Sequence, residues 1–405
     1  MLSINSTTAR LSALSLLVVS TFHLLASHQI NRRYLQQEQE QQQPLQLSTH
    51  RGFGTHYITL QIGNPAQPVR LAVSTGSDFT ALPCIGCQGV ENQVDKSYNY
   101  NLSGGDIHMC PDDCVFASSR CLDGKTDGTD QCMVKVTFDP LDDMTGGYKG
   151  IEISSQVYID TEHTPVLDNT GSQSKKPSAN GFLLDFVCQT ELKGDMSTET
   201  LALGGILGMS TAPTSFLHQM YLAGKIKQRI FSLCFRGFQD YQPNGVSAGQ
   251  VTFGGYDPTR FDTPLVWVKN TANIQHLSTY AVHIRRIYMG LGGGDEALQR
   301  AAQGTMSILP IDMDPVPIDA VEVQGSSANV DYSGLNGEDG VVLIQTNTPT
   351  TCLHKSIEAG FKKAFQSMTG IEYEPEMKIG RDQFEMLPTV LLQFEVCITS
   401  LNLRY

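Results

Sequence analysis

Residues 71–84 read LAVSTGSDFTALPC, an apolar strand that runs into a Thr-Gly-Ser turn and returns into a second apolar run. We expect Gly76 to supply a turn conformation with a positive φ angle. The last residue of the strand, here Ser74, stands where the chain enters the turn, so its side chain is presented by the loop. The stretch therefore predicts a loop that displays Ser74 in a cleft.

A second stretch repeats this pattern near the other end of the chain. Residues 340–353 read GVVLIQTNTPTTCL, again an apolar strand followed by a polar residue, a threonine and a turn. Gln345 and Thr346 take the places of Ser74 and Thr75. The repeat predicts a bilobed β protein in which the two loops face each other.

The two stretches resemble the active-site loops of the pepsin-like aspartic endopeptidases, and more closely those of the plant-type, nepenthesin-like branch. In that family the first loop reads D-T-G-S and the second D-S-G-T or D-T-G-T. Other landmarks of the family follow in the same order, and the resemblance covers about residues 52–397. They are YITLQIGNPAQPVRLAV (57–73), FVCQTEL (186–192), GGILGMSTAPTSFLHQM (204–220), IFSLCFRG (230–237), GQVTFGGYDPTRF (249–261) and LPTVLLQFE (387–395).

The resemblance implies a mainly β, bilobal pepsin-like acid-protease fold, with two β-rich lobes around a central cleft. Many short β-type runs bounded by Gly, Pro, Asn and Asp agree with it. Relative to the family, the C-terminal lobe is expected to be incomplete. The expected segments are a signal peptide or signal anchor (1–27), a Gln-rich tether or pro-segment (28–50), an N-terminal β lobe with a Cys-rich insertion (51–240) and a truncated C-terminal β lobe (241–405).

The family's chemistry requires two neighbouring aspartates that share one proton, so that one activates water while the other polarises the scissile carbonyl. Ser74 and Gln345 stand at those positions here. A hydroxyl is not a base near neutral or acidic pH, and an amide does not exchange a proton usefully. Loss of each acid–base role costs about 10²–10⁴-fold in rate. We therefore expect a non-catalytic or severely impaired homologue, a pseudoenzyme that retains a peptide-binding cleft.

Two alternatives stay open at this point. One is an active, secreted aspartic-type endopeptidase that cleaves proteins at acidic pH; the other is a cell-wall or carbohydrate-binding protein on the same fold. Asp78 matches an acidic position that many plant-type members carry beside an intact catalytic aspartate, so we assign it a structural part. Glu338 and Asp339 are expected at the far end of their strand, and no histidine is nominated as a base for Ser74.

The resemblance also implies the residues that surround the cleft. Thr75 and Thr346 match threonines that hydrogen-bond the two loops to each other beneath the family's active site. Phe138 takes the place of the flap tyrosine, with Tyr148 as the alternative. The expected cleft residues are Thr75, Gly76, Ser77, Phe138, Thr346 and Thr348.

Ten cysteines, an even number, indicate disulfides in an exported chain. Cys188 and Cys234 match a pair of cysteine positions in the family. The candidates are Cys84, Cys87, Cys110, Cys114, Cys121, Cys132, Cys188, Cys234, Cys352 and Cys397, with Cys352–Cys397 as one possible pair. The Cys84-x2-Cys87 and Cys110-x3-Cys114 spacings also occur in zinc sites, but oxidation competes with metal binding in the secretory pathway, so no metal and no cofactor is expected.

Charge and targeting signals restrict the partners and the compartment. The 28 Lys and Arg residues against 41 Asp and Glu give a net charge of −13, which excludes nucleic acid as a partner. We expect an extended peptide or protein ligand, and nothing in the sequence indicates an oligomeric state. The apolar run 11–27 predicts secretory export to an extracellular or vacuolar, lysosome-like space, or membrane anchoring if it stays uncleaved. Asn101 opens a glycosylation sequon.

Overall fold

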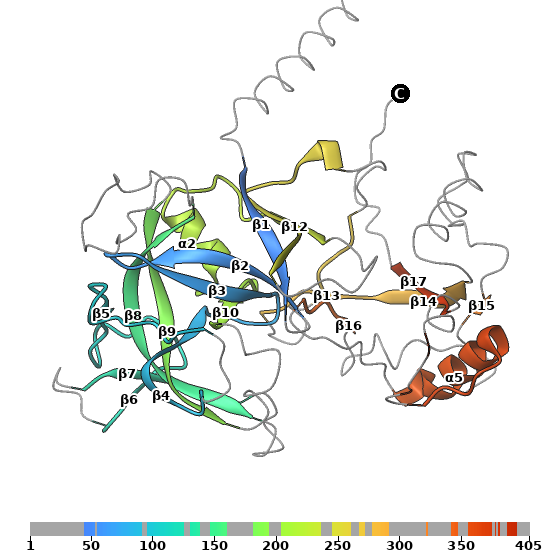
Figure 1. Cartoon of the computed structure of the whole chain (residues 1–405), viewed down its shortest axis with the longest axis horizontal. Helices are drawn as coiled ribbons and strands as arrows, with labels where there is room; N and C mark the ends of the chain where they lie inside the picture. Colours follow the sequence, from blue (N-terminus) through green and yellow to red (C-terminus); the bar gives the residue numbers. More distant parts are fainter. Residues whose placement is uncertain are drawn as a thin grey trace, which may run out of the picture.

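The computed structural model is dominated by β-strands (Figure 1). It describes residues 44–52, 55–90, 95–124, 130–137, 146–159, 181–193, 204–235, 245–260, 267–271, 278–290, 321–322, 342–346, 355–374, 377, 380 and 387–394. The mainly β fold class expected from the sequence is confirmed.

One twelve-stranded sheet makes up most of the described chain. Its order is β11-β12-β1-β2-β3-β10-β4-β9-β8-β7-β6, and β5 pairs with β8 outside this path. The strands are β1 (Leu45–Gly52), β2 (Thr55–Ile62), β3 (Gln67–Ser74), β4 (Ala81–Gln88), β5 (Asp106–Ile107), β6 (Arg120–Cys121), β7 (Cys132–Thr137), β8 (Gly147–Tyr158), β9 (Gly181–Lys193), β10 (Ile206–Gly208), β11 (Phe231–Phe235) and β12 (Val246–Phe253).

The centre of this sheet forms the main hydrophobic core. Ile58, Leu60 and Ile62 of β2 occupy alternate positions, on one face of the strand, and are fully buried. Leu71 and Val73 of β3 join them, and burying one such aliphatic side chain stabilises the fold by about 1.5–3 kcal/mol. β3 lies between antiparallel β2 and parallel β10, so its end is held from both sides.

A short helix, α2 (Phe216–Leu222), seals this core from one side. Ser215 caps its N-terminus by accepting a hydrogen bond from the backbone N–H of His218. Phe216 is fully buried, and its ring lies 5.5 Å from that of Phe182 and 5.6 Å from that of Phe253. The helix thus joins β9 and β12, which are distant along the sheet order.

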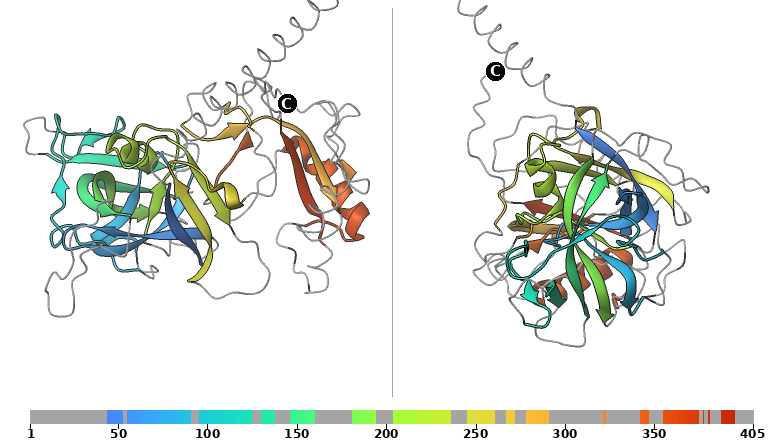
Figure 2. Two further views of the ribbon diagram at one scale, coloured as in Figure 1. Left: turned by 90° about the horizontal axis from the view of Figure 1, so that it is seen from above. Right: turned by 90° about the vertical axis from the view of Figure 1, so that its left-hand side faces the viewer.

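A smaller unit follows in sequence and lies beside the large sheet (Figure 2). β14 (Ile284–Gly290) pairs with both β15 (Val321–Glu322) and β17 (Thr389–Phe394), and α5 (Lys355–Thr369) packs on this sheet. Its core contains Ile284, Ile287, Ile357, Ala364 and Phe365. β13 (Ala281–Val282) and β16 (Val342–Leu343) form a separate two-stranded sheet, and a 3-10 turn covers Pro258–Arg260.

Two strands lie differently from the segment boundaries expected from the sequence. β1 begins at Leu45, inside the stretch 28–50 that we expected to be a tether, because residues 45–50 pair with β12 and β2. β12, which falls in the expected C-terminal lobe, pairs with β1 and β11 of the expected N-terminal lobe. The division into two lobes at residue 240 stays a prediction.

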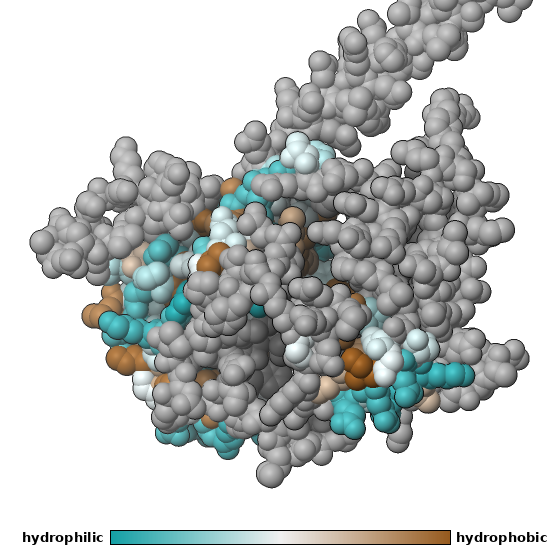
Figure 3. Space-filling model, turned by 45° about the vertical axis from the view of Figure 1, so that its right-hand side comes forward, coloured by the Kyte–Doolittle hydropathy of each residue, from teal (hydrophilic) through white to brown (hydrophobic). Residues whose placement is uncertain are grey.

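The polarity of the surface and of the helices indicates whether the described residues could contact or cross a membrane. The coloured residues on the face in Figure 3 are mostly hydrophilic, with apolar residues in small separate groups. Among the residues that the structure describes, no helix is both long and apolar enough to cross a bilayer. The N-terminal apolar run 11–27 lies outside the described residues.

Candidate functional site

The first loop leaves the large sheet at the end of β3. Ser74 pairs with Gly208 of β10, and the backbone N–H of Met209 donates to the Ser74 carbonyl at 2.8 Å. The side chain of Ser74 is fully buried, and its Oγ lies 2.8 Å from Oγ of Ser77. Ser74 is therefore held by a local hydrogen bond within its own turn.

The second loop follows β16 and is attached to a much smaller sheet. The backbone N–H of Ile344 donates to the Tyr280 carbonyl at 2.8 Å, which extends the β13–β16 pairing. Gln345 is exposed and Thr346 is half-buried. The residues after Thr346, including Thr348 of the expected cleft, lie outside the described residues.

Thr75 and Thr346 join the two loops through a reciprocal set of hydrogen bonds. The Thr75 backbone N–H donates to Thr346 Oγ1 at 3.3 Å, and the Thr346 N–H donates to Thr75 Oγ1 at 3.2 Å. Each hydroxyl also donates across the junction, Thr75 Oγ1 to the Ile344 carbonyl at 2.6 Å and Thr346 Oγ1 to the Val73 carbonyl. Both hydroxyls thus act as donor and acceptor, and together they hold the first loop against the second.

Gly76 lies close to the second loop, but its backbone conformation differs from the one expected. Its φ angle is not positive, so the expectation of a left-handed turn conformation is wrong. Instead, a Cβ at this position would lie 3.0 Å from Nε2 of Gln345. The absent side chain leaves the space in which the Gln345 amide packs against the first loop.

Asp78, the one acid in the stretch 71–84, is hydrogen-bonded to the segment that precedes α2. Its carboxylate accepts a hydrogen bond from Ser210 Oγ at 2.8 Å, and its carbonyl accepts one from Thr214 Oγ1 at 2.9 Å. Both partners lie in the segment that leads into α2. These contacts give Asp78 a structural part in fastening the first loop; Glu338 and Asp339 lie outside the described residues.

The strands β7 and β8 form the hairpin in which the family resemblance places the flap. Its strands pair from Met133 and Ile151 to Thr137 and Gly147, and Phe138 lies outside the described residues. Tyr148 is buried in a small apolar cluster with Val134. Burial, with a further contribution from the charge of Asp78, raises the pKa of the Tyr148 phenol well above its usual range. Tyr148 is thus a neutral core residue.

The cysteines pair in a way that spacing did not determine. The disulfides are Cys84–Cys188, Cys110–Cys121 and Cys114–Cys132. Cys188 therefore bonds to Cys84 rather than to Cys234, its partner position in the family resemblance. Cys234 is exposed on β11, Cys87 is buried outside these three disulfides, and Cys352 and Cys397 lie outside the described residues.

The sequon residue Asn101 lies in an exposed turn. Ser103, the third residue of the sequon, is only 1% exposed, and its Oγ accepts a hydrogen bond from Gln67 Nε2. Asn101 and Leu102 are thus at the surface, while Ser103 is buried in the fold.

One polar cluster was missed at the level of sequence. His108 lies between two carboxylates, with Nδ1 3.4 Å from Glu152 Oε2 and Nε2 3.6 Å from Asp185 Oδ1. Its interaction with Glu152, joined by the charge of Asp185, raises the pKa of His108 against the opposing effect of burial. Ser154 completes the cluster: its hydroxyl donates to Asp185 and lies within hydrogen-bond distance of His108 Nε2. The residue is buried, 6% exposed. The only local signal was the i, i+2 placement of Glu152 and Ser154 on one strand.

Comparison with known families gives the class of the domain that contains the large sheet, which is pepsin-like. More particularly, residues 56–255 match the family described as "Xylanase inhibitor N-terminal", which has this fold. Residues 56–255 therefore form a pepsin-like, aspartic-protease-related domain.

A shorter likeness connects the chain to curated proteins. A stretch of 51 residues is 33% identical to Plasmepsin V of Plasmodium falciparum isolate 3D7, and covers 13% of this chain and 9% of that protein. Plasmepsin V of isolate NF54 matches with the same identity over the same shares of the two chains. The match thus spans less than a tenth of the length of these relatives.

Proposed function

We propose that this protein is a non-catalytic member of the pepsin-like class, of the plant-type branch, and that it binds extended peptide or protein segments in the cleft between its two loops. The observation that carries the proposal is the pair of side chains at the junction. Ser74 and Gln345 directly precede Thr75 and Thr346, whose hydrogen bonds join the two loops, and they take the positions of the two aspartates in the family resemblance. Neither side chain is a carboxylate.

The surroundings of Ser74 support loss of catalysis rather than its replacement. A nucleophilic serine requires a base within hydrogen-bond reach. Ser74 Oγ is 2.8 Å from the hydroxyl of Ser77, which is not a base, and Asp78 is bonded to Ser210 instead. The shared-proton mechanism requires two neighbouring carboxyl groups, and Ser74 and Gln345 supply neither of them.

Retention of the junction supports binding. The two threonines keep four hydrogen bonds between the loops, although no acid needs to be positioned by them. An extended peptide can be held in such a cleft by main-chain hydrogen bonds that do not require the acids. The name of the matching family refers to inhibitors of an enzyme, which is consistent with a protein-binding role for this domain.

We also propose that the protein is exported and glycosylated at Asn101. Three disulfides among the described residues suit an oxidising compartment. The exposed position of Asn101 suits attachment of a glycan. Removal of N-glycans from secreted protein is expected to lower its mass, and Asn101→Gln is expected to abolish that change.

The experiment that tests the main proposal measures cleavage and binding separately. Secreted protein is incubated with denatured protein substrate between about pH 3 and pH 6, with and without a statine-type transition-state analogue. We expect no statine-sensitive turnover, together with saturable binding of extended peptides from a library. Statine-sensitive turnover by the unmodified protein would overturn the non-catalytic assignment.

A matched pair of variants sharpens the result. The double variant Ser74→Asp with Gln345→Asp restores both acids, and Ser74→Asn with Gln345→Asn has similar volume without acid function. Activity in the first and not in the second would show that the cleft is intact apart from the two acids. Absence of peptide binding in the unmodified protein and both variants would overturn the binding role.

A further inference from the structure

We infer that the Cys-rich insertion holds a second, redox-dependent site: when the Cys110–Cys121 and Cys114–Cys132 disulfides are reduced, their four thiolates bind one Zn²⁺ ion. The oxidised state is the one in the structure. In the reduced state the metal would replace both disulfides as the cross-link of the insertion. The inference does not depend on the cleft or its ligand.

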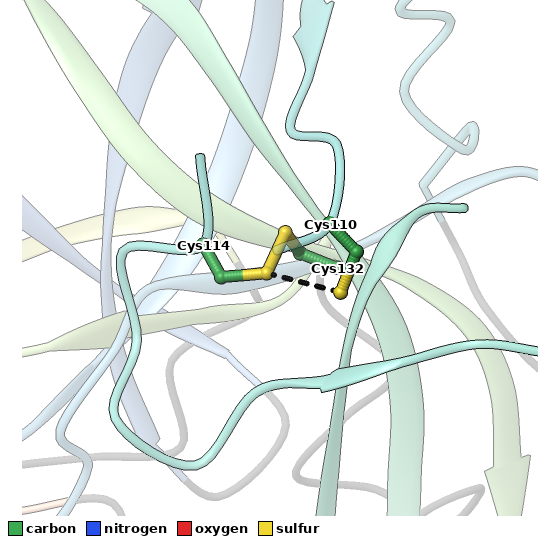
Figure 4. A group of neighbouring side chains, drawn as sticks. All are labelled: Cys110, Cys114 and Cys132. Carbon is green, nitrogen blue, oxygen red and sulfur yellow. Dashed lines mark hydrogen bonds between the residues drawn. A yellow bond between two sulfur atoms is a disulfide. The ribbon is translucent and has the colours of Figure 1, made fainter. Parts of the chain in front are cut away.

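The sulfur atoms already converge on one point. Cys110 Sγ and Cys114 Sγ, which belong to different disulfides, are 3.6 Å apart. The sulfurs of Cys110, Cys114 and Cys132 all lie within 4.8 Å of one another (Figure 4), and the sulfur of Cys121 is bonded to that of Cys110. With Zn–S bonds of about 2.3 Å, the sulfurs of a tetrahedral site are about 3.8 Å apart. Formation of the site therefore requires the two disulfide bonds to open and the Cys121 sulfur to join the other three.

Two of the cysteines are held in place without help from their disulfides. The backbone N–H of Cys110 donates to the Asp130 carbonyl at 2.7 Å, and that of Cys132 donates to the His108 carbonyl at 3.0 Å. Met109 and Gln131 form a β-bridge between the same two segments. These contacts persist when the sulfur–sulfur bonds are broken, so Cys110 and Cys132 are expected to stay side by side.

The other two cysteines are fixed from neighbouring elements. Cys121 of β6 pairs directly with Cys132 of β7. The residues after Cys114 are fastened to the buried carboxylate of Glu152, which accepts the backbone N–H groups of Val115 at 2.7 Å and Phe116 at 3.4 Å. The four ligands thus come from a framework that does not need disulfides to position it.

Exposure makes these two disulfides accessible to a reductant in preference to the third. Cys114 and Cys121 are half-buried, so each disulfide of the cluster has one accessible sulfur, whereas Cys84 and Cys188 are both fully buried. A thiol or phosphine reductant supplies two electrons, and solvent two protons, to each disulfide and leaves four thiols. Zn²⁺ then displaces the four thiol protons and is bound by four thiolates.

The test is cysteine footprinting of the full chain. Protein treated with a phosphine reductant without oxygen is pulsed with N-ethylmaleimide with and without Zn²⁺, and each cysteine is quantified by peptide mass spectrometry. We expect Zn²⁺ to slow the alkylation of Cys110, Cys114, Cys121 and Cys132 by about tenfold or more. Exposed Cys234 is the internal control and is expected to react at the same rate in both samples. Equal rates at the four cluster cysteines with and without Zn²⁺ would overturn the inference.

A spectroscopic measurement identifies the ligands. Co²⁺ added to the reduced chain is expected to give the absorption of tetrahedral thiolate-bound cobalt at one ion per chain. The paired variant Cys114→Ser with Cys132→Ser is expected to lose this spectrum, and Cys234→Ser is expected to keep it. A four-thiolate spectrum that survives in the paired variant would place the metal on other cysteines and contradict the inference. Footprinting of the unmodified chain decides the question if the paired variant does not fold.

Discussion

The two loops that meet at the junction have the same sequence pattern but very different support. The first, at Ser74, ends a strand that is hydrogen-bonded on both sides within the twelve-stranded sheet, and Ser74 and Thr75 are 0% and 3% exposed. The second follows the two-residue strand β16, and Gln345 is exposed. The first loop is therefore a rigid platform, and the second loop is positioned mainly by its hydrogen bonds to that platform. A change that disturbs the buried groups of the first loop is therefore expected to cost more stability than one that disturbs the groups of the second loop.

The largest effect on stability is expected from adding a side-chain carbon at Gly208 of β10, which packs against the first loop. In Gly208→Ala, the new Cβ would lie 2.4 Å from the backbone carbon of Phe79, which cannot move without displacing the loop. We expect a loss of about 3 kcal/mol or more in the free energy of unfolding. Denaturation by guanidinium chloride measures it. The control is Gly224→Ala, where a Cβ meets no atom within 4 Å but the φ angle of +67° is strained, for an expected loss of about 1 kcal/mol.

The single acid substitutions compare the two loops directly. Ser74→Asp places a carboxylate at a fully buried position, which raises its folded-state pKa above that of the unfolded chain. The destabilisation, about 2–3 kcal/mol, is therefore expected at neutral pH and should diminish as the pH falls through this raised pKa, because the neutral acid is tolerated. Gln345→Asp, at an exposed position, is expected to change stability by less than about 0.5 kcal/mol. Unfolding measured at several pH values checks both, and equal losses would remove the distinction between the loops.

The threonines give a smaller and more symmetric comparison. Thr75→Val and Thr346→Val each remove one hydroxyl that donates and accepts across the junction. We expect a loss of about 2 kcal/mol for Thr346→Val, because the Thr75 N–H and the Val73 carbonyl that lose their partner belong to buried residues. We expect about 1 kcal/mol for Thr75→Val, because the Thr346 N–H and the Ile344 carbonyl belong to a half-buried and an exposed residue. The double variant should lose less than the sum, because the two hydroxyls share one network. Strict additivity in this double-mutant cycle would argue against a shared network.

The last comparison concerns Gly76, where a small effect on stability is expected. In Gly76→Ala the new Cβ would lie 3.0 Å from Nε2 of Gln345, the mobile end of an exposed side chain that can turn away. We expect a loss of about 0.5–1 kcal/mol, relieved when Gln345 is also changed to Ala. Thermal unfolding of Gly76→Ala, Gln345→Ala and the pair checks this. No relief in the pair would mean that the backbone, rather than the amide, limits the position.

The sequence predicted the mainly β fold because short apolar runs and turn residues are local signals. It also indicated helical stretches around 215–224, 294–302 and 355–368, of which the first and the last correspond to α2 and α5 and the second lies outside the described residues. The hydrogen bonds between Thr75 and Thr346 join residues 271 positions apart, so only the family resemblance pointed to them. The spacing of the cysteines along the sequence did not predict the disulfides, because Cys84 and Cys188 are brought together by the parallel pairing of β4 with β9. The role of Gly76 depends on a side chain from the other loop, which no local pattern reveals.

The pairing of β1 with β12 has a consequence for how the chain can be made and divided. Leu45 lies opposite Phe253, so the edge of the first strand stays uncovered until a segment far later in the chain has left the ribosome. A fragment that stops near residue 240 would keep β1 and lack the strand that covers it. Expression of the domain on its own should therefore extend through Phe253, and a shorter fragment is expected to associate through the exposed edge of β1.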